Sequence, residues 1–342
     1  MTQPLSRRGF VAVTAAAALA SPYVARAAEP FRLRCSLDTA PTHMRNISIG
    51  DYLQKLEAAS GGRIKTELFH AGALFADVNV AKALLQGQVE MACPGTWVLT
   101  GFVPDCDMVN LPVMYSQPIE ICRRVTDGKT GAHVNTQLHT KLRAQVLGLW
   151  LQLGFQHWCS ATRPITALAD LKGMKIRITG GAAMAWRTRF FGANPNTTAW
   201  PDVPLALSQG TFDGLITTNE SAFSAKLWEA GLKSSLQDRQ NVDNYIPMVS
   251  EAFLHALPKD LQALVVDTWQ QSIAGFRTQM LAAQERALAG LHEHGVVYTI
   301  PPDEEIAAVR KKMMSEQPKL MKELRLTAEL PKLVAEDLRP VA

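Results

Sequence analysis

The chain has 342 residues, of which 47% are hydrophobic and 19% are charged, and its formal net charge is +4. This is the composition of an ordinary globular protein that is long enough for two domains. Residues 1–27 carry Arg7, Arg8 and Arg26 but no acidic residue, so the remainder of the chain has a formal charge of only +1. A nearly neutral chain argues against a nucleic-acid or anionic-membrane partner, because both need basic patches.

The first 27 residues have the features of an export signal. A twin-arginine pattern at residues 6–10 is followed by an apolar run at 11–20 and a small-residue site at 25–27. We expect cleavage after residue 27 or 28 and export to the periplasm by the twin-arginine route. The alternative, a soluble amino-terminal helix, is disfavoured because the apolar run has no polar face and Pro22 follows it. No later segment approaches the ~20 apolar residues of a membrane span.

Strand-like segments alternate with helical segments along the rest of the chain, and the alternation occurs in two sets. The first set consists of a strand at 31–37, a helix at 47–59, a strand at 64–69, a helix at 78–86 and a strand at 89–92. The second consists of strands at 147–153 and 174–178, helices at 182–191 and 203–209, and a strand at 214–218. Such alternation is typical of βα units and a mostly parallel sheet, so we predict two α/β domains.

A long helix is expected between Pro258 and Gly295. Pro258 suits the first helical turn, and no further proline interrupts the following residues. At ~1.5 Å per residue, a helix over this range would extend roughly 57 Å, which exceeds the width of one domain of this size. We therefore expect it to belong to both domains, with two helices broken near Gly275 as the alternative.

Five cysteines occur, at positions 35, 93, 106, 122 and 159, and their spacing fits neither a CxxC motif nor a zinc site. We interpret them as buried small apolar side chains, with a disulfide such as Cys106 to Cys122 as the alternative in an oxidising compartment.

The motifs of the common enzyme classes do not occur in the sequence. It contains no nucleophile elbow, phosphate-binding loop, dinucleotide fingerprint or HExxH sequence. We therefore predict that the protein is not an enzyme, and we assign no catalytic residue, no metal site and no cofactor.

Polar and aromatic residues instead gather where the predicted strands end, which is where α/β sheets bind their ligands. These residues are Asp38, Thr39, Thr96, Trp97, Gln156, His157 and Thr217. Arg177 differs from them because it lies within the apolar strand Lys175-Ile176-Arg177-Ile178, where an unpaired guanidinium is costly. Two interpretations remain open for Arg177: an internal ion pair with a carboxylate, or a contact with an anionic ligand.

Several short motifs give the chain a family resemblance between about residues 31 and 316. They are SGGRI at 60–64, GAL at 72–74, ALLQG at 83–87, DLKGMKIR at 170–177, GANP at 192–195 and GTFDG at 210–214. In this order and spacing they resemble the periplasmic solute-binding subunits of TRAP (tripartite ATP-independent periplasmic) transporters, the DctP-like group.

The resemblance implies a two-domain periplasmic binding protein fold, with the ligand in a cleft between the domains and a long carboxy-terminal helix that spans both. The first domain would comprise residues 29–153 and 243–281, and the second residues 154–242 and 282–342. The implied function is to capture a small organic acid and deliver it to TRAP membrane permease subunits, and we expect a monomer. The alternative is an extracytoplasmic module that senses the same ligand for a membrane receptor.

The resemblance also implies roles for particular residues. Arg177 would form a two-pronged salt bridge to the ligand carboxylate, because a planar guanidinium matches a planar carboxylate. Asp38 and Asp77 resemble polar contacts of the first domain. Thr96 and Trp97 resemble a loop that faces the cleft, and Trp200 an aromatic residue that covers the ligand. Core packing is the alternative for both tryptophans.

Two positions depart from the family pattern. Thr217 stands where many relatives have asparagine, and a threonine cannot reproduce the same hydrogen-bond geometry. Gln156 stands where many relatives have a second arginine, so the site has one cation fewer. Both are retained as ligand-binding candidates, and the neutral Gln156 favours a monocarboxylate with a hydroxyl or aromatic body over a dianion.

Overall fold

The computed structural model describes residues 29–339. The expected export signal, its cleavage site and the twin-arginine pattern lie outside these residues. In chain order the strands are β1 Phe31–Ser36, β2 Ile64–Phe69, β3 Met91–Ala92, β4 Ala144–Val146, β5 Leu151–Phe155, β6 His157–Ser160, β7 Lys175–Ile178, β8 Asn194–Thr197, β9 Gly214–Thr217, β10 Ser234–Leu236, β11 Val242–Tyr245, β12 Met248–Ser250 and β13 Val297–Thr299.

The helices lie between and after these strands along the chain. The α-helices are α1 Met44–Ala59, α2 Asp77–Leu85, α3 Thr96–Leu99, α4 Ile119–Asp127, α5 Lys129–Leu142, α6 Ala182–Phe190, α7 Val203–Ser208, α8 Asn219–Ser224, α9 Glu251–Ala256, α10 Lys259–Glu293, α11 Asp303–Glu323 and α12 Leu330–Asp337. Short 3-10 helices are η1 Pro104–Asn110, η2 Pro112–Met114, η3 Leu168–Leu171 and η4 Trp200–Asp202.

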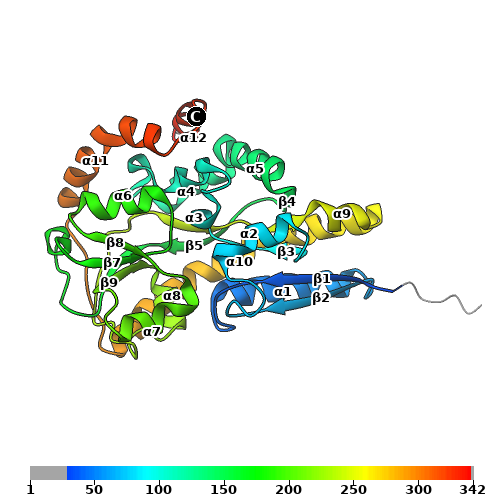
Figure 1. Ribbon diagram of the computed structural model, residues 1–342, viewed down its shortest axis with the longest axis horizontal. Helices are drawn as coiled ribbons and strands as arrows, with labels where there is room; N and C mark the ends of the chain where they lie inside the picture. Colours follow the sequence, from blue (N-terminus) through cyan, green and yellow to red (C-terminus); the bar gives the residue numbers. More distant parts are fainter. Residues whose placement is uncertain (1–28, 340–342) are drawn as a thin grey trace, which may run out of the picture. The chain divides into compact units, whose positions relative to one another are not determined.

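The strands form two large sheets and one connecting pair (Figure 1). The first large sheet has the order β2-β1-β3-β12-β4, the second has the order β13-β10-β6-β9-β7-β8, and β5 pairs with β11. Strand β5 leads directly into β6 of the second sheet, and β11 leads back into β12 of the first. The chain therefore crosses between the sheets twice through this pair of strands, and a third time through α10, which leads from β12 of the first sheet to β13 of the second.

The crossings through β5 and β11 place one reversed strand in each sheet, β12 in the first and β6 in the second. The other strands of each sheet run in one direction, so the sheets are mostly parallel as the sequence predicts. Strand β1 pairs in parallel with β2 and β3, as expected for βα units. Strand β12 is antiparallel to β3 and β4, and β6 is antiparallel to β9 and β10. The antiparallel members are thus the strands that directly follow β5 and β11.

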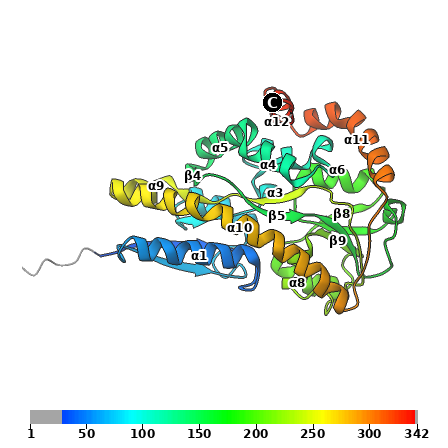
Figure 2. The same cartoon turned by 180° about the vertical axis from the view of Figure 1, so that it is seen from behind.

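Helix α10 is continuous over 35 residues and passes through Gly275 without a break. The alternative of two shorter helices is therefore wrong, and the length corresponds to about 52 Å. The helix contacts α1 and β5, and it also contacts α8 (Figure 2). A Cβ atom at Gly290 would lie 2.4 Å from the Phe223 ring of α8, so the absence of a side chain allows this close approach.

The packing of α1 against α10 follows from residue spacing. Ile49, Tyr52, Leu53 and Leu56 recur at the interval that places them on one face of α1, and all four are buried. They belong to the same core cluster as residues of α10, and the Tyr52 ring meets the Trp269 ring edge-on at a centroid distance of 5.5 Å. This core anchors the long helix beneath the first sheet.

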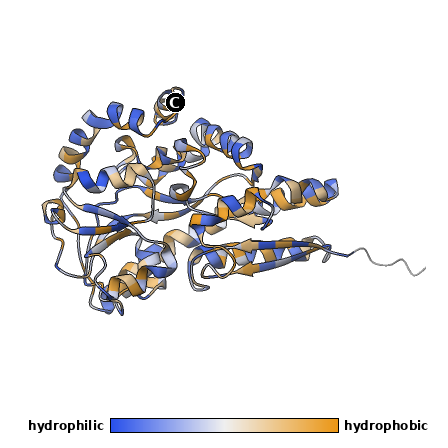
Figure 3. Cartoon of the chain, in the orientation of Figure 1, coloured by the Kyte–Doolittle hydropathy of each residue, from blue (hydrophilic) through white to orange (hydrophobic). Residues whose placement is uncertain are grey.

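The last helices return toward the half that contains the first sheet. Leu330 and Val334 of α12 share a core cluster with Val134 and Leu138 of α5. Helices α11 and α12 carry both hydrophilic and hydrophobic residues along their length (Figure 3), as expected for helices with one face on a core. The domain boundaries at residues 153, 242 and 281 stay predictions, and α12 contacts elements of the predicted first domain.

The cysteine interpretation is confirmed, because all five cysteines are buried and none forms a disulfide. Across residues 29–339, none of the helices combines the length and apolar character needed to cross a membrane.

Candidate ligand-binding site

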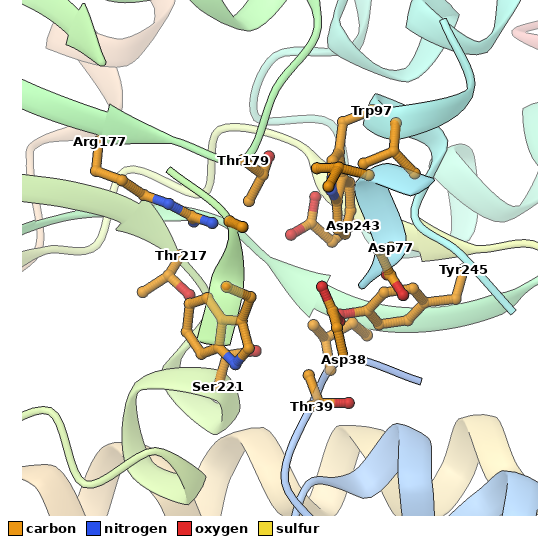
Figure 4. Close-up of a pocket in the computed structure, with 15 residues that line it drawn as sticks. Asp38, Thr39, Asp77, Trp97, Arg177, Thr179, Thr217, Ser221, Asp243 and Tyr245 are labelled. Carbon is orange, nitrogen blue, oxygen red and sulfur yellow. The ribbon is translucent and has the colours of Figure 1, made fainter. Parts of the chain in front are cut away.

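Side chains from beside both large sheets line one cavity. Figure 4 shows the Arg177 side chain entering from one side, with Asp38, Asp77 and Tyr245 on the opposite side. The lining residues are Asp38, Thr39, Asp77, Val78, Trp97, Val98, Leu153, Arg177, Thr179, Ala199, Trp200, Thr217, Ser221, Asp243 and Tyr245.

The ends of the strands supply much of this lining, as the sequence predicts. Asp38 and Thr39 follow β1, Thr217 ends β9, and Thr179 follows β7. The carboxyl ends of neighbouring strands in an α/β sheet meet at one edge, and this brings together side chains that lie far apart in the sequence.

Six of the eight predicted ligand-binding residues line the cavity. They are Arg177, Trp200, Thr217, Asp38, Asp77 and Trp97. The other two, Gln156 and Thr96, are fully buried and are not lining residues. Thr96 begins α3 immediately before Trp97, and Gln156 lies between β5 and β6. The contacts of all eight with a ligand stay predictions.

The guanidinium of Arg177 is buried and carries no internal ion pair. Its Nε and Nη2 atoms donate to the carbonyl of Thr198 at 3.0 and 2.8 Å, and Nη1 has no hydrogen-bond partner. Among the described residues no carboxylate lies within 4.0 Å of it, so the ion-pair interpretation is wrong. Burial lowers the pKa of Arg177 to about 10, which still leaves the side chain charged at neutral pH.

Another arginine, Arg45, forms the internal ion pairs of the site. Its Nη1 lies 2.6 Å from Asp77 Oδ2, and its Nη2 lies 2.5 Å from Asp38 Oδ1. The guanidinium also lies 4.2 Å from the centroid of the Tyr245 ring. Burial raises the pKa of Asp77 to about 7, against the opposing effect of Arg45. Asp38 and Asp77 thus have two roles: both line the cavity, and both form an ion pair with Arg45.

Asp243 lies on β11 and was not among the predicted site residues. Its Oδ1 accepts a hydrogen bond from Gln156 Nε2 at 2.6 Å, and Gln156 Oε1 accepts one from Arg187 Nη2 at 3.1 Å. Burial raises the pKa of Asp243 to about 7, although the Gln156 hydrogen bond and nearby arginines oppose this rise. Gln156 is thus placed behind Asp243 rather than at the cavity wall.

The aromatic residues form part of the cavity surface. Trp97 meets the Tyr245 ring edge-on at a centroid distance of 5.4 Å, and it belongs to a core cluster as well as to the lining. Its indole lies over Gly95, where a Cβ atom would be 2.2 Å away. The Arg177 guanidinium lies 5.3 Å from the centroid of the partly buried Trp200 ring. Trp97 therefore both lines the cavity and packs in the core, which were its two interpretations. Trp200 lies next to Arg177, the predicted carboxylate anchor.

Five polar or aromatic residues of the site were not predicted from the sequence: Asp243, Tyr245, Ser221, Thr179 and Arg45. The signal for Thr179 was available, because it directly follows the predicted strand that ends at residue 178. Asp243 and Tyr245 lie two positions apart on the short strand β11. The partner of this strand, β5, lies about 90 residues earlier in the chain, so the position of both residues depends on a long-range pairing.

Two α/β halves that are joined by crossing strands and line a common cavity have the architecture of the periplasmic binding proteins. Residues 38–323 match the bacterial extracellular solute-binding proteins, family 7, and the chain belongs to that family. This confirms the family and the two-domain fold that the sequence motifs indicated.

Solved structures of similar fold include two proteins with organic acids bound. A TRAP periplasmic solute-binding protein from Sulfurospirillum deleyianum with bound succinate is 22% identical, with a TM-score of 0.82 over 90% of this chain and 98% of that chain. The sugar acid binding protein DctPAm from Advenella mimigardefordensis, in complex with galactonate, is 20% identical, with a TM-score of 0.83 over 91% and 97%.

Relatives in sequence include the C4-dicarboxylate-binding periplasmic protein DctP of Rhodobacter capsulatus. It is 25% identical over 85% of this chain and 86% of its own length. A solute-binding protein of Verminephrobacter eiseniae is likewise 25% identical, over 80% of both chains.

Proposed function

We propose that this protein captures a small monocarboxylic acid in the cavity between its halves and delivers it to a TRAP-type membrane permease. The single observation that carries the ligand class is the buried guanidinium of Arg177, which lines the cavity and has no carboxylate partner among the described residues. A buried charge of this kind is costly unless an opposite charge pairs with it.

The geometry of Arg177 suits a carboxylate. The carbonyl of Thr198 occupies the Nε and Nη2 side of the guanidinium, which leaves Nη1 and the second hydrogen of Nη2 as a pair of parallel donors. Two parallel donors on a planar cation match the two oxygens of a planar carboxylate. The carboxylate would thus gain both charge and orientation from one residue.

The surrounding charges favour one ligand carboxylate over two. The charge of Arg45 is already balanced by Asp38 and Asp77, and the predicted second cation position holds the neutral Gln156. A second ligand carboxylate would have to lie among Asp38, Asp77 and Asp243, where like charges repel. We therefore propose that a dianion binds less tightly than a monoanion of similar size.

The proposed role is binding without turnover. The halves would close on the ligand, and closure would be driven by contacts that the ligand makes with both of them. We propose that the protein acts as a monomer in the periplasm, uses no cofactor and releases the unchanged acid to the permease.

A thermal-shift screen of organic acids tests this proposal. A carboxylate present at about 100 times its Kd stabilises the folded state by about 2.7 kcal/mol, which should raise Tm by about 5 °C. The matched controls are the uncharged amides of the same acids, which should give no comparable shift. If no carboxylate stabilises the protein, or if the amides do so equally, the carboxylate assignment is wrong.

Export by the twin-arginine route is a separate proposal, which the mass of the mature protein tests. We expect protein recovered from the periplasm to lack residues 1–27 or 1–28, and a variant with Arg7→Lys and Arg8→Lys together to remain inside the cell. Periplasmic protein with an intact amino terminus would contradict the proposed cleavage, and normal export of the double variant would contradict the route.

A further inference from the structure

Asp243 is a buried carboxylate at the cavity wall with an incomplete set of partners. It lines the cavity with only 4% of its surface exposed. Within residues 29–339 its one protein hydrogen bond comes from Gln156, and no arginine or lysine forms an ion pair with it. Its second oxygen, Oδ2, has no hydrogen-bond donor among these residues, and Figure 4 shows the Asp243 side chain at the cavity.

The side chain of Gln156 is held in one orientation by its two neighbours. Arg187 can only donate hydrogen bonds, so the amide oxygen of Gln156 must face it. The amide nitrogen then faces Asp243 Oδ1 and donates to it at 2.6 Å. This arrangement presents Asp243 with a donor, which favours the ionised carboxylate as a hydrogen-bond acceptor.

The backbone around Asp243 is also specialised. The pairing of β11 with β5 is irregular between Asp243 and Asn244, and Asp243 lies opposite Gly154. Gly154 has a φ of +144°, and a Cβ atom there would come within 2.8 Å of the Gln284 side chain. Irregular strand pairings of this kind re-aim side chains next to binding sites.

We propose that Asp243 is the second recognition residue of the site, and that the ligand carries a hydrogen-bond donor, either a hydroxyl or an ammonium group, that Asp243 accepts. The inference rests on the proposed function, in which Arg177 holds the ligand carboxylate. An acid without such a donor leaves Oδ2 desolvated and unpaired in the closed site, which costs affinity. Asp38 and Asp77 differ from Asp243 in charge balance, because Arg45 forms ion pairs with both of them, although Asp77 Oδ1 is also buried without a hydrogen-bond partner.

Calorimetric titration of a matched set of acids tests the inference. The set is butyrate, its hydroxy and amino derivatives, and succinate, together with each acid from the thermal-shift screen paired with its deoxy or deamino counterpart. We expect the wild-type protein to bind a donor-bearing acid about 10- to 100-fold more tightly than its unsubstituted counterpart. A preference for amino over hydroxy derivatives identifies the donor as ammonium, and the reverse identifies a hydroxyl.

The variant Asp243→Asn separates Asp243 from the anchor. Its amide keeps an oxygen for Gln156 and presents a donor to the cavity, so the preference for amino acids should disappear, the preference for hydroxy acids should weaken because the hydroxyl must then accept, and the affinity for succinate should rise relative to that for butyrate. The control is Asp267→Asn, an exposed position on α10, which should retain the wild-type ratios. Should Asp243→Asn fail to fold, the wild-type ratios still decide the question.

The outcomes distinguish this inference from the proposed function. If unsubstituted acids bind as tightly as their donor-bearing partners, or if Asp243→Asn keeps the wild-type ratios, Asp243 is not a recognition residue and the Arg177 anchor stands. If succinate is preferred and calorimetry in two buffers shows proton uptake on binding, Asp243 acts as a protonated donor and the inference is overturned. If no acid of either set binds, both proposals fail.

Discussion

Replacing Arg177 with alanine is expected to weaken carboxylate binding by about 2–5 kcal/mol, which is about 30-fold to several thousand-fold in Kd. The closed site would then hold a desolvated ligand carboxylate without its cation. Arg177→Lys should recover only part of the loss, because a lysine supplies a point charge in place of two parallel donors. Gln156→Ala should cost less, near the ~1 kcal/mol of a neutral hydrogen bond, since Gln156 acts behind Asp243.

Calorimetric titration of these variants with a carboxylate that binds the wild-type protein measures the difference. The control is Arg189→Ala, because Arg189 is exposed on α6 and does not line the cavity. The affinity of this variant for the carboxylate should match that of the wild type. Binding by Arg177→Ala within about threefold of the wild type would show that the guanidinium only supports the Thr198 carbonyl.

Residues that end predicted strands could be assigned to the site from the sequence alone. Asp38, Thr217 and the strand that contains Arg177 were found because a periodic apolar segment also reveals where it ends, and strand ends in an α/β sheet converge on one edge. The same rule gives a position but not a side-chain direction. This is why Gln156 was placed at the cavity wall, although its amide points toward Asp243 and Arg187.

The residues that were missed depend on contacts across long stretches of the chain. Asp243 reaches the cavity because β11 pairs irregularly with the distant β5, and no local pattern records that pairing. Arg45 looks like an ordinary residue in the first turn of α1, and its two carboxylate partners lie 7 and 32 positions away. Arg45 is therefore the arginine that forms ion pairs in the folded protein, whereas Arg177, which lines the cavity, forms none with the described residues.

The role of Arg45 predicts the largest loss of stability. Arg45→Met should lower the free energy of unfolding by about 3–5 kcal/mol, because it leaves two buried carboxylates, Asp38 and Asp77, without their cation. The matched control is Arg63→Met, which removes an exposed ion pair with Asp260 and should cost no more than about 1 kcal/mol. Urea unfolding monitored by circular dichroism measures both changes.

The stability loss caused by Arg45→Met should also depend on pH, and the buried carboxylate of Asp77 determines whether the loss grows or shrinks as pH rises. Burial already raises the pKa of Asp77 to about 7 in the presence of Arg45, and removal of the guanidinium raises it further. In the unfolded chain an aspartate has a pKa of about 3.9, so above that pH the folded variant holds protons that the unfolded chain has released. The free energy of unfolding of the variant therefore falls as pH rises. The difference from wild type should be larger at about pH 8 than at about pH 5, where the folded variant can keep the Asp77 carboxyl neutral. A loss that is equal at both values, or larger in acid, would mean that Arg45 stabilises the fold through its packing on Tyr245 rather than through its charge.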